Sequence, residues 1–378
     1  MRILQLGRFW KLIGGVQMHA QLLCKGLAAQ GVDVVDLVAS LKHERSDQRV
    51  NGFRMVEAAS FGVHFATAIS PDMVRLARQL HREQPFDLIH LHFPDPMSHL
   101  VSLAMPAQIP RVITWHSDIV KQKHLLKLYR PFQRREIMRA RAIVAPTTAH
   151  FASSTQIPGL YPSAQRHIIP FGMDYSLLDM TPTIQARMEQ VRARAGSRMV
   201  VFALGRHVEY KGFDVLLDAL QHTQAYLVLG GDGPLTPALQ AQALQLGLSD
   251  RVWFAGRLSD EDMAACYHAC DVFCLSSVSP NEAFGLVQLE AMACGKPVIC
   301  TQLNNGVNAV NPHEVTGLTV PVRDAPALGH AIETLRLNEP LRQRLGQQAY
   351  LHARGTYSMQ AMSERHVRLY QDLLSTCS

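Results

Sequence analysis

The chain has 378 residues, of which 47% are hydrophobic and 18% charged, a globular composition with enough length for two domains. No run of 18 or more apolar residues could cross a membrane, and the residues after Met1 are too interrupted for a secretory signal, so we expect a cytoplasmic protein. The net charge of +6 is uneven: residues 1–172 carry 21 Lys and Arg against 11 Asp and Glu, whereas residues 173–378 carry 16 against 20.

Strand-like and helix-like segments alternate along the whole chain, which predicts an α/β protein with parallel sheets. A strand is expected over residues 2–6, followed by a Gly14-Gly15 turn and an amphipathic helix over 16–30. Further buried strands are expected in the first half at residues 32–39, 86–92, 111–115 and 142–146.

A basic segment lies within residues 119–144, where eight Lys and Arg stand against the single Glu136. Leucines and Tyr129 supply apolar groups beside these charges. The segment is compatible with docking on an anionic membrane surface or a phosphorylated acceptor, and equally with a solvated helix face. Neither an RNA-binding motif nor interleaved aromatic residues are present, so no nucleic-acid partner is expected. The candidate surface residues are Lys121, Lys123, Lys127, Arg130, Arg134 and Arg135.

The periodic pattern loosens between residues 170 and 197 and then restarts. Strands are expected at 199–204, 225–229, 252–255, 271–275 and 297–301. We therefore predict two doubly wound units, over 1–172 and 198–355, joined by a linker over 173–197. A helical tail over 356–378 is expected to pack back on the first unit.

Polar residues follow several of these strands, and in open α/β sheets ligands bind beyond the carboxyl ends of the strands. Gly205 permits a tight exit after the strand 199–204, and Arg206 and Lys211 place two cations suited to a diphosphate on one loop. His116 follows the strand 111–115, where it could bond a sugar hydroxyl or serve a structural purpose. The amides of Gly14-Gly15 could meet a phosphate or form a plain turn.

A pair of glutamates, Glu282 and Glu290, flanks a second candidate phosphate site. A helix is predicted over Phe284 to Cys294, closed by Gly295, with Glu282 at or just before its start and Glu290 two turns in. The two carboxylates would then lie about 12 Å apart along the axis, too far for a retaining glycosidase pair at roughly 5 Å. They could instead hold two ends of an elongated ligand, or simply be solvated. The anionic middle of such a ligand would meet the amides of Phe284, Gly285 and Leu286.

Other nucleotide-binding classes are disfavoured, because neither the dinucleotide fingerprint GxGxxG nor the P-loop GxxxxGK[ST] occurs. Six motifs in order instead make the chain resemble the GT-B retaining glycosyltransferases of family 4. They are GGV at residues 14–16, HSD at 116–118, GRHVEYKG at 205–212, GGDGP at 230–234, EAFGLVQLEAMACGKPVI at 282–299 and EVTGLTVPVRD at 314–324. The resemblance implies two facing Rossmann-like domains, an acceptor-side domain first and a nucleotide-sugar-binding domain second, with the active site in the cleft between them.

The resemblance also implies the role of each motif residue in the second unit. Glu282 would contact the hydroxyls of the donor sugar and Glu290 those of the ribose. Arg206 and Lys211 would bind the diphosphate and stabilise the leaving nucleoside diphosphate, with Gly205 in the same loop.

In the first unit, the resemblance implies that His116 supports the transferring sugar and that the amides of Gly14 and Gly15 cap the phosphate. The catalytic set is then His116, Arg206, Lys211 and Glu282. The family usually lacks an obvious nucleophile, which implies front-face attack with retention of configuration, without a metal or any other cofactor.

Two shorter stretches, HSDIVKQK from His116 and GVNAVN from Gly306, look like those of bacterial mannosyl- and rhamnosyltransferases that build lipopolysaccharide or exopolysaccharide on lipid carriers. We therefore expect a donor such as GDP-mannose, a lipid-linked saccharide acceptor and peripheral attachment to the inner face of the cytoplasmic membrane. Two alternatives remain open: a relative that acts on a soluble acceptor such as a sugar phosphate, and a non-catalytic protein that binds nucleotide sugars.

Overall fold

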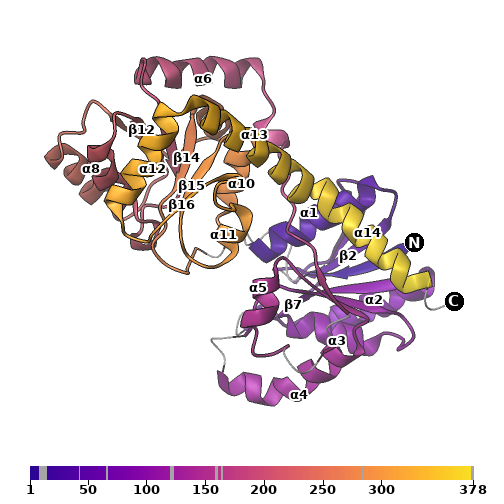
Figure 1. Ribbon diagram of the computed structural model, residues 1–378. Helices are drawn as coiled ribbons and strands as arrows, with labels where there is room; N and C mark the ends of the chain where they lie inside the picture. Colours follow the sequence, from indigo (N-terminus) through magenta and orange to yellow (C-terminus); the bar gives the residue numbers. More distant parts are fainter. Residues whose placement is uncertain are drawn as a thin grey trace. The chain divides into compact units, whose positions relative to one another are not determined.

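The computed structural model describes residues 1–7, 15–41, 43–64, 67–119, 123–157, 161–162, 165–282 and 284–375. The chain forms two compact units, each built around its own sheet (Figure 1). Unit 1 comprises Met1–Met173 and Ser358–Ser378, and unit 2 comprises Asp174–Tyr357.

The described residues of unit 1 form an eight-stranded sheet in the order β10-β9-β8-β7-β1-β2-β4-β3, parallel except for the edge strand β3. Its strands are β1 (Arg2–Leu6), β2 (Asp33–Ala39), β3 (Ser46–Val50), β4 (Phe53–Ala58), β7 (Leu88–Phe93), β8 (Arg111–Trp115), β9 (Ala142–Ala145) and β10 (Arg166–Ile168). A short hairpin joins β5 (Val63–His64) to β6 (Thr67–Ala68). Its helices are α1 (Gly15–Ala29), α2 (Pro71–Glu83), α3 (Pro96–Ala104), α4 (Lys123–Arg139), α5 (Thr148–Ser153) and α14 (Met359–Ser375).

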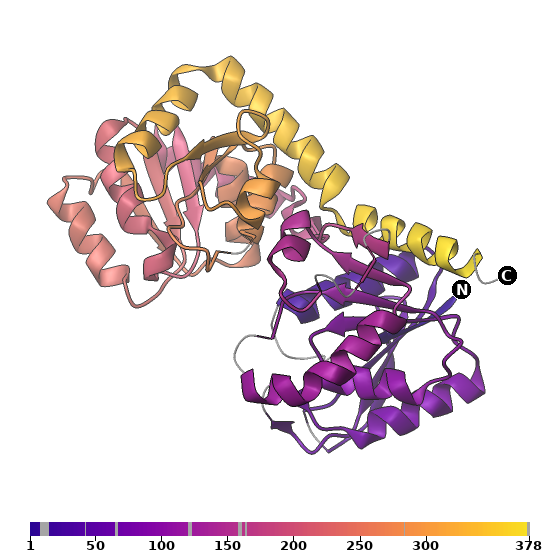
Figure 2. The same ribbon diagram turned by 60° about the horizontal axis from the view of Figure 1, so that its bottom comes forward.

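Helices cover both faces of this sheet, which is why its central strands are buried on both sides. Leu4 and Leu6 face the helices α2 and α3, whereas Ile3 faces α1 and α14. The helix α14 lies along α1 in both views (Figures 1 and 2). The Gln30 amide donates to the Ser363 hydroxyl at 2.5 Å, so the end of the chain completes the first unit.

Unit 2 contains a parallel sheet whose described residues give six strands in the order β13-β12-β11-β14-β15-β16. The strands are β11 (Val200–Leu204), β12 (Tyr226–Gly230), β13 (Val252–Gly256), β14 (Val272–Leu275), β15 (Val298–Thr301) and β16 (Gly317–Val320). The α-helices are α6 (Pro182–Ala195), α7 (Phe213–Ala219), α8 (Thr236–Gln245), α9 (Asp260–Ala269), α10 (Leu286–Ala293), α11 (Gly306–Val310), α12 (Ala325–Leu337) and α13 (Glu339–Thr356). Short 3₁₀ turns cover Ser176–Leu178, Glu209–Lys211 and Leu220–His222.

Residues 173–197 differ from the linker expected there, because most of them belong to unit 2. The Thr181 hydroxyl caps α6 by accepting from the Ile184 amide at 3.2 Å. The helix packs on α9, and Arg187 forms an ion pair with Asp262 at 2.5 Å. Its apolar stripe is thin, with only Ile184, Val191 and Ala195 buried, so the sequence shows little helical periodicity.

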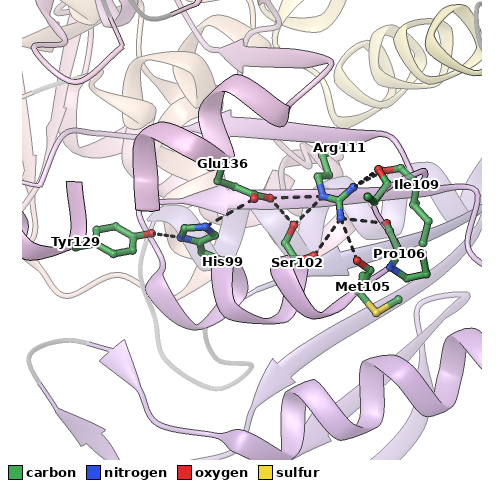
Figure 3. Close-up of polar contacts among 9 residues, drawn as sticks. His99, Ser102, Met105, Pro106, Ile109, Arg111, Tyr129 and Glu136 are labelled. Atoms are coloured by element: carbon green, nitrogen blue, oxygen red, sulfur yellow. Dashed lines mark hydrogen bonds and ion pairs between the residues drawn. The ribbon is translucent and has the colours of Figure 1, made fainter. Parts of the chain in front are cut away.

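A buried polar network fastens α4 to α3 and β8 in unit 1 (Figure 3). The Arg111 guanidinium donates to the carbonyl oxygens of the turn that follows α3, including that of Ile109 at 2.5 Å. Its Nε atom donates to the Ser102 hydroxyl at 3.0 Å and lies 3.6 Å from the Glu136 carboxylate. Arg111 and Glu136 are almost wholly removed from water. The basic helix α4 therefore depends on this network for its place.

We expect Arg111→Lys to lower the free energy of unfolding by about 3 kcal/mol, because a lysine cannot reach the carbonyls that the planar guanidinium serves and leaves several of them unsatisfied. Urea denaturation monitored by circular dichroism measures the change. Arg82→Lys on the exposed face of α2 is the matched control and should alter stability by less than about 0.5 kcal/mol. Equal urea midpoints for the two variants would show that the network does not stabilise the fold.

Candidate functional site

The strand order of unit 2 marks where a ligand should bind. The strand β11 lies inside the sheet, with β12 and β13 on one side of it and β14, β15 and β16 on the other. The direction in which the chain adds strands reverses between β11 and β14, so the loops after these two strands flank the reversal point. Such a point opens a crevice at the carboxyl ends of the strands. The loop after β11 carries residues 205–211, and the loop after β14 carries residues 276–285.

An ion pair joins these two loops. Lys211 Nζ donates to Glu282 Oε2 at 2.5 Å, and both side chains are about nine-tenths buried. The Ser277 hydroxyl donates to the same carboxylate oxygen at 2.9 Å. Two of the predicted site residues therefore meet, 71 positions apart in the chain. The ammonium has three protons and the carboxylate about four acceptor sites, so both keep capacity for a ligand.

Two glycines allow close contacts between the backbones of the loops around Lys211. A Cβ atom on Gly231, whose φ is 106°, would lie 1.9 Å from the carbonyl oxygen of Gly205. A Cβ atom on Gly212, whose φ is 63°, would lie 2.2 Å from the carbonyl oxygen of Ser276. Any larger residue at these two positions would force the loops apart and move the ion pair.

The helix α10 begins later than the sequence predicted. Its N-cap is Gly285 and its first residue is Leu286, so Glu282 lies in the preceding loop and the axial distance of about 12 Å does not apply. The Asn305 side chain holds this loop by donating to the Glu282 carbonyl at 2.8 Å. In the first turn of α10, the Gln288 amide donates to the carbonyl of the N-cap Gly285 at 2.9 Å.

Glu290 lies on α10, where a tyrosine fixes its position. Tyr267 Oη donates to Glu290 Oε2 at 2.6 Å from the neighbouring helix α9. Burial raises the pKa of Glu290, while the bond from Tyr267 opposes the rise. The carboxylate is therefore oriented before any ligand arrives.

Three partners of the glutamates were missed in the sequence, namely Ser277, Tyr267 and Asn305. Ser277 stands two residues beyond a predicted strand, which is a usable signal, and Asn305 precedes an apolar run as an N-cap would. Nothing in the sequence marks Tyr267. Arg206, by contrast, is exposed, and its side chain makes no hydrogen bond or ion pair with the described residues.

In unit 1 the strand order reverses between β1 and β7, and histidines gather beside this point. His92 lies on β7, and His116 follows β8, where its amide donates to the Phe93 carbonyl at 3.0 Å. Gly15 is the first residue of α1, and His19 lies one turn further on. Gly14 falls outside the described residues.

A chain of hydrogen bonds orients His116. Gln5 Nε2 lies 2.5 Å from His92 Nε2, and His92 Nδ1 lies 2.9 Å from His116 Nε2. Because an amide nitrogen only donates, His92 Nε2 accepts and the ring proton sits on Nδ1, which donates to His116. Burial lowers the pKa of His92 to about 3, so this ring is neutral at pH 7.

Asp36 is a further buried group that sequence reasoning missed. It lies in the middle of β2 and lines a cavity of about 10 Å³ together with Gly7 and His92. Its Oδ1 atom has no hydrogen-bond partner among the described residues. Burial raises the pKa of this carboxyl group to about 7.

The basic segment forms the helix α4. Arg130, Arg134 and Arg135 are exposed on it, as are the apolar side chains of Phe132 and Met138. Lys121 and the side chains of Lys123 and Lys127 fall outside the described residues. Within the described ranges, none of the helices combines the length and the apolar character that crossing a membrane requires.

Two sequence families match the chain, and together they cover most of it. The family described as "Glycosyltransferase Family 4" matches residues 13–177, and the family described as "Glycosyl transferases group 1" matches residues 185–352.

Individual relatives match the chain over nearly its whole length. The O-antigen chain mannosyltransferase C of Escherichia coli is 30% identical over 365 residues, which is 97% of this chain and 96% of the relative. The D-rhamnosyltransferase WbpZ of Pseudomonas aeruginosa is 33% identical over 353 residues, 92% of this chain and 90% of the relative. Among solved structures, Anabaena HepE in complex with UDP superimposes with a TM-score of 0.71 at 21% identity, covering 98% of this chain and 100% of that one.

We expect Asp36→Asn to stabilise the protein more at high pH than at low pH. An unfolded aspartate loses its proton near pH 3.9, whereas the folded Asp36 keeps its proton until about pH 7. The stabilisation by the protonated group is thus fully present below about pH 4 and is lost as pH rises to about 7, at about 1.4 kcal/mol per pH unit. The asparagine does not titrate.

Urea denaturation at pH 5 and pH 8 measures this difference. The gain in unfolding free energy of Asp36→Asn over the wild type should grow by roughly 2 to 3 kcal/mol between these pH values. Asp33→Asn at the exposed start of the same strand is the control and should show a constant difference. A gain that does not change with pH would mean that Asp36 titrates normally.

Proposed function

The chain belongs to the family 4 glycosyltransferases and has their GT-B fold, and on that premise we propose that this hexosyltransferase moves a hexose from a nucleotide diphosphate sugar to a saccharide acceptor, with retention of configuration. The observation that carries the proposal is the Lys211–Glu282 ion pair at the reversal point of unit 2. It puts a cation for a diphosphate beside a carboxylate for sugar hydroxyls, close in sequence to the N-terminus of α10.

The donor contacts follow from the chemistry of each group. Lys211 and the exposed Arg206 bind the diphosphate, with Gly205 between the strand and these cations. The amides of Phe284, Gly285 and Leu286, at the start of α10, add neutral donors to the same phosphates. Glu282 accepts from the hydroxyls of the transferred sugar.

We assign Glu290 to the nucleoside end of the donor. Its carboxylate is fixed by Tyr267 and half-buried, which suits a pair of hydroxyls such as those of a ribose. From unit 1, we assign His116 to the transferring sugar and the Gly14-Gly15 amides to the phosphate. The bonded chain from Gln5 through His92 supports the His116 assignment, because it fixes the ring before the sugar arrives.

In the transfer step, the bond between the sugar and the diphosphate breaks and negative charge builds on the leaving phosphate. Lys211 is placed to stabilise that charge. Glu282 is already bonded to Lys211 and Ser277, so it serves to bind rather than to attack. The acceptor hydroxyl then attacks from the face of the leaving group, and a phosphate oxygen takes its proton, which preserves the configuration.

We propose that the reaction needs no metal. The D-x-D triplet Asp260-Glu261-Asp262 has the spacing of a metal clamp, but it forms the first turn of α9. Asp262 and Glu261 both pair with Arg187, and the Ser259 hydroxyl donates to Asp262. These contacts support a structural role for the triplet.

For the identity of the substrates, the two relatives named above support a mannose or rhamnose donor such as GDP-mannose. Their names also support an acceptor in surface polysaccharide synthesis, which we take to be lipid-linked. The exposed arginines and apolar residues of α4 suit attachment to the anionic inner face of the cytoplasmic membrane.

We expect Lys211→Ala and Glu282→Ala each to reduce transfer by at least about a thousandfold, because each removes a group that binds the reacting part of the donor. Release of nucleoside diphosphate from GDP-mannose in the presence of acceptor measures the rate. Thermal shift with GDP-, UDP-, ADP- and dTDP-sugars identifies the donor, since a ligand at a hundred times its Kd stabilises by about 2.7 kcal/mol.

Arg257→Ala is the control in the same unit, because this side chain is 89% exposed. It should keep both activity and the thermal shift. The double variant Lys211→Ala/Glu282→Ala removes both charges, so it should fold at least as well as either single variant while remaining inactive. Full activity in either single variant would refute the assignment of the pair.

Reversing charge on α4 should weaken membrane binding. Each basic residue near an anionic surface contributes about 1 kcal/mol, so Arg134→Glu/Arg135→Glu should reduce binding to phosphatidylglycerol vesicles by at least about thirtyfold. Sedimentation with the vesicles measures this. Arg75→Glu/Arg82→Glu on α2 makes the same change of charge and should bind as the wild type does. If neither pair alters binding or activity, the membrane proposal fails and a soluble acceptor is favoured.

A further inference from the structure

Three histidines of unit 1 converge at the carboxyl end of its sheet. His19 comes from α1, His92 from β7, and His116 from the residue after β8. One ring nitrogen of each lies within 4.8 Å of those of the other two. Phe171 closes one side of the group, with its ring centre 4.3 Å from that of His19.

His19 is the unusual member of this group. Its side chain is buried, with 4% of its surface exposed, yet neither Nδ1 nor Nε2 has a hydrogen-bond partner among the described residues. Buried polar atoms are nearly always bonded, because leaving one without a partner costs about 1 to 3 kcal/mol. The His19 ring meets those of His92 and His116 edge to face, with centres 5.5 and 5.2 Å apart.

We propose that His19, His92 and His116 form a binding site for a divalent transition cation, with Zn²⁺ as the representative ion. Neutral imidazole is a preferred ligand of Zn²⁺, and three histidines leave the fourth position of a tetrahedron open. The cation gives one of the two unpartnered nitrogens of His19 a partner.

The spacing of two of the ligand nitrogens is close to that in a zinc site. Two nitrogens bound to tetrahedral zinc at 2.0–2.1 Å lie about 3.3 Å apart, and His92 Nδ1 and His116 Nε2 are now 2.9 Å apart. For Nδ1 of His92 to bind a cation, its ring proton must move to Nε2. The Gln5 amide then turns over, so that Oε1, which has no partner now, accepts from that N–H. A second bond of this kind typically fixes a zinc-bound histidine.

The protonation state of the ligands favours binding at neutral pH. Burial lowers the pKa of His19 well below its ordinary value, and the neighbouring His116 adds to this effect. Burial also lowers the pKa of His92 to about 3. Neither ring has to release a proton before it binds a metal.

Zinc bound at this site inhibits the transfer of the sugar, and this conclusion rests on the proposed function. A cation bound to Nε2 of His116 replaces the bond from His92 Nδ1 that orients this ring for the transferring sugar. The metal therefore acts against the transfer rather than in it, which agrees with a reaction that needs no metal.

Metal binding is tested on the full-length protein after treatment with a chelator. Titration with Zn²⁺ against a chromophoric chelator should show one tight equivalent for the wild type. His19→Phe should lower that affinity by at least a hundredfold, and phenylalanine suits a buried site beside Phe171 that offers the ring nitrogens no partner. The same substitution at the exposed His222 is the control for the other histidines of the chain.

Co²⁺ provides a second measurement that needs no variant, because four-coordinate Co²⁺ with nitrogen ligands has intense visible absorption. His116→Phe, at a half-buried position, replaces His19→Phe if the latter does not fold. No tight equivalent in the wild type, or an unchanged one in a folded His19→Phe or His116→Phe protein, overturns the site whatever the activity. Zinc that binds to the wild type without slowing transfer overturns the inhibition.

Discussion

The ion pair between Lys211 and Glu282 is the contact on which the candidate site of unit 2 depends. Two opposite charges lie 2.5 Å apart where water barely reaches them, held from loops that follow different strands. Their attraction offsets the cost of removing both from water only while each has the other, so neither can be lost alone without a large penalty. The glycines that bring the loops together and the Ser277 and Asn305 side chains that hold Glu282 all serve this one contact. A donor that binds here meets groups that are already in place.

Much of the fold, and two residues that meet in the candidate site of unit 2, could be predicted because they follow from local rules. Apolar runs predicted most of the parallel strands. The loop after the predicted strand 199–204 indicated Lys211, and the predicted start of a helix near Phe284 indicated Glu282. Features that depend on packing were not predictable in the same way. The helix α6 shows too little apolar surface for a periodic pattern, and the polar strand β3 shows none. The helix α10 starts at Leu286 and not at the predicted Phe284, because the preceding residues form the loop that brings Glu282 to Lys211.

The histidines of unit 1 likewise depend on packing that the sequence does not reveal. His90 and His92 are two residues apart in β7 and so share one face of the sheet, but this spacing does not say what that face meets. In the structure it meets α1 and α14, where His19 and Tyr370 lie. His90 is fully bonded, to Tyr370 at 2.6 Å and Thr114 at 2.8 Å, whereas His19 is not bonded at all within the described part of the chain. The histidines that meet between β7 and α1 thus differ in their hydrogen bonds, and the sequence does not show this difference.

The position of α14 has a consequence for the order in which the protein is made. Unit 2 is one continuous stretch of chain, so it can form its core as soon as its last residue has been synthesised. Unit 1 has segments on both sides of unit 2 in the sequence, because Met362, Leu369 and Tyr370 belong to its core. On the ribosome, the domain whose synthesis starts first is therefore the last to be finished. Until α14 has been synthesised, the apolar face of α1 that it covers remains exposed.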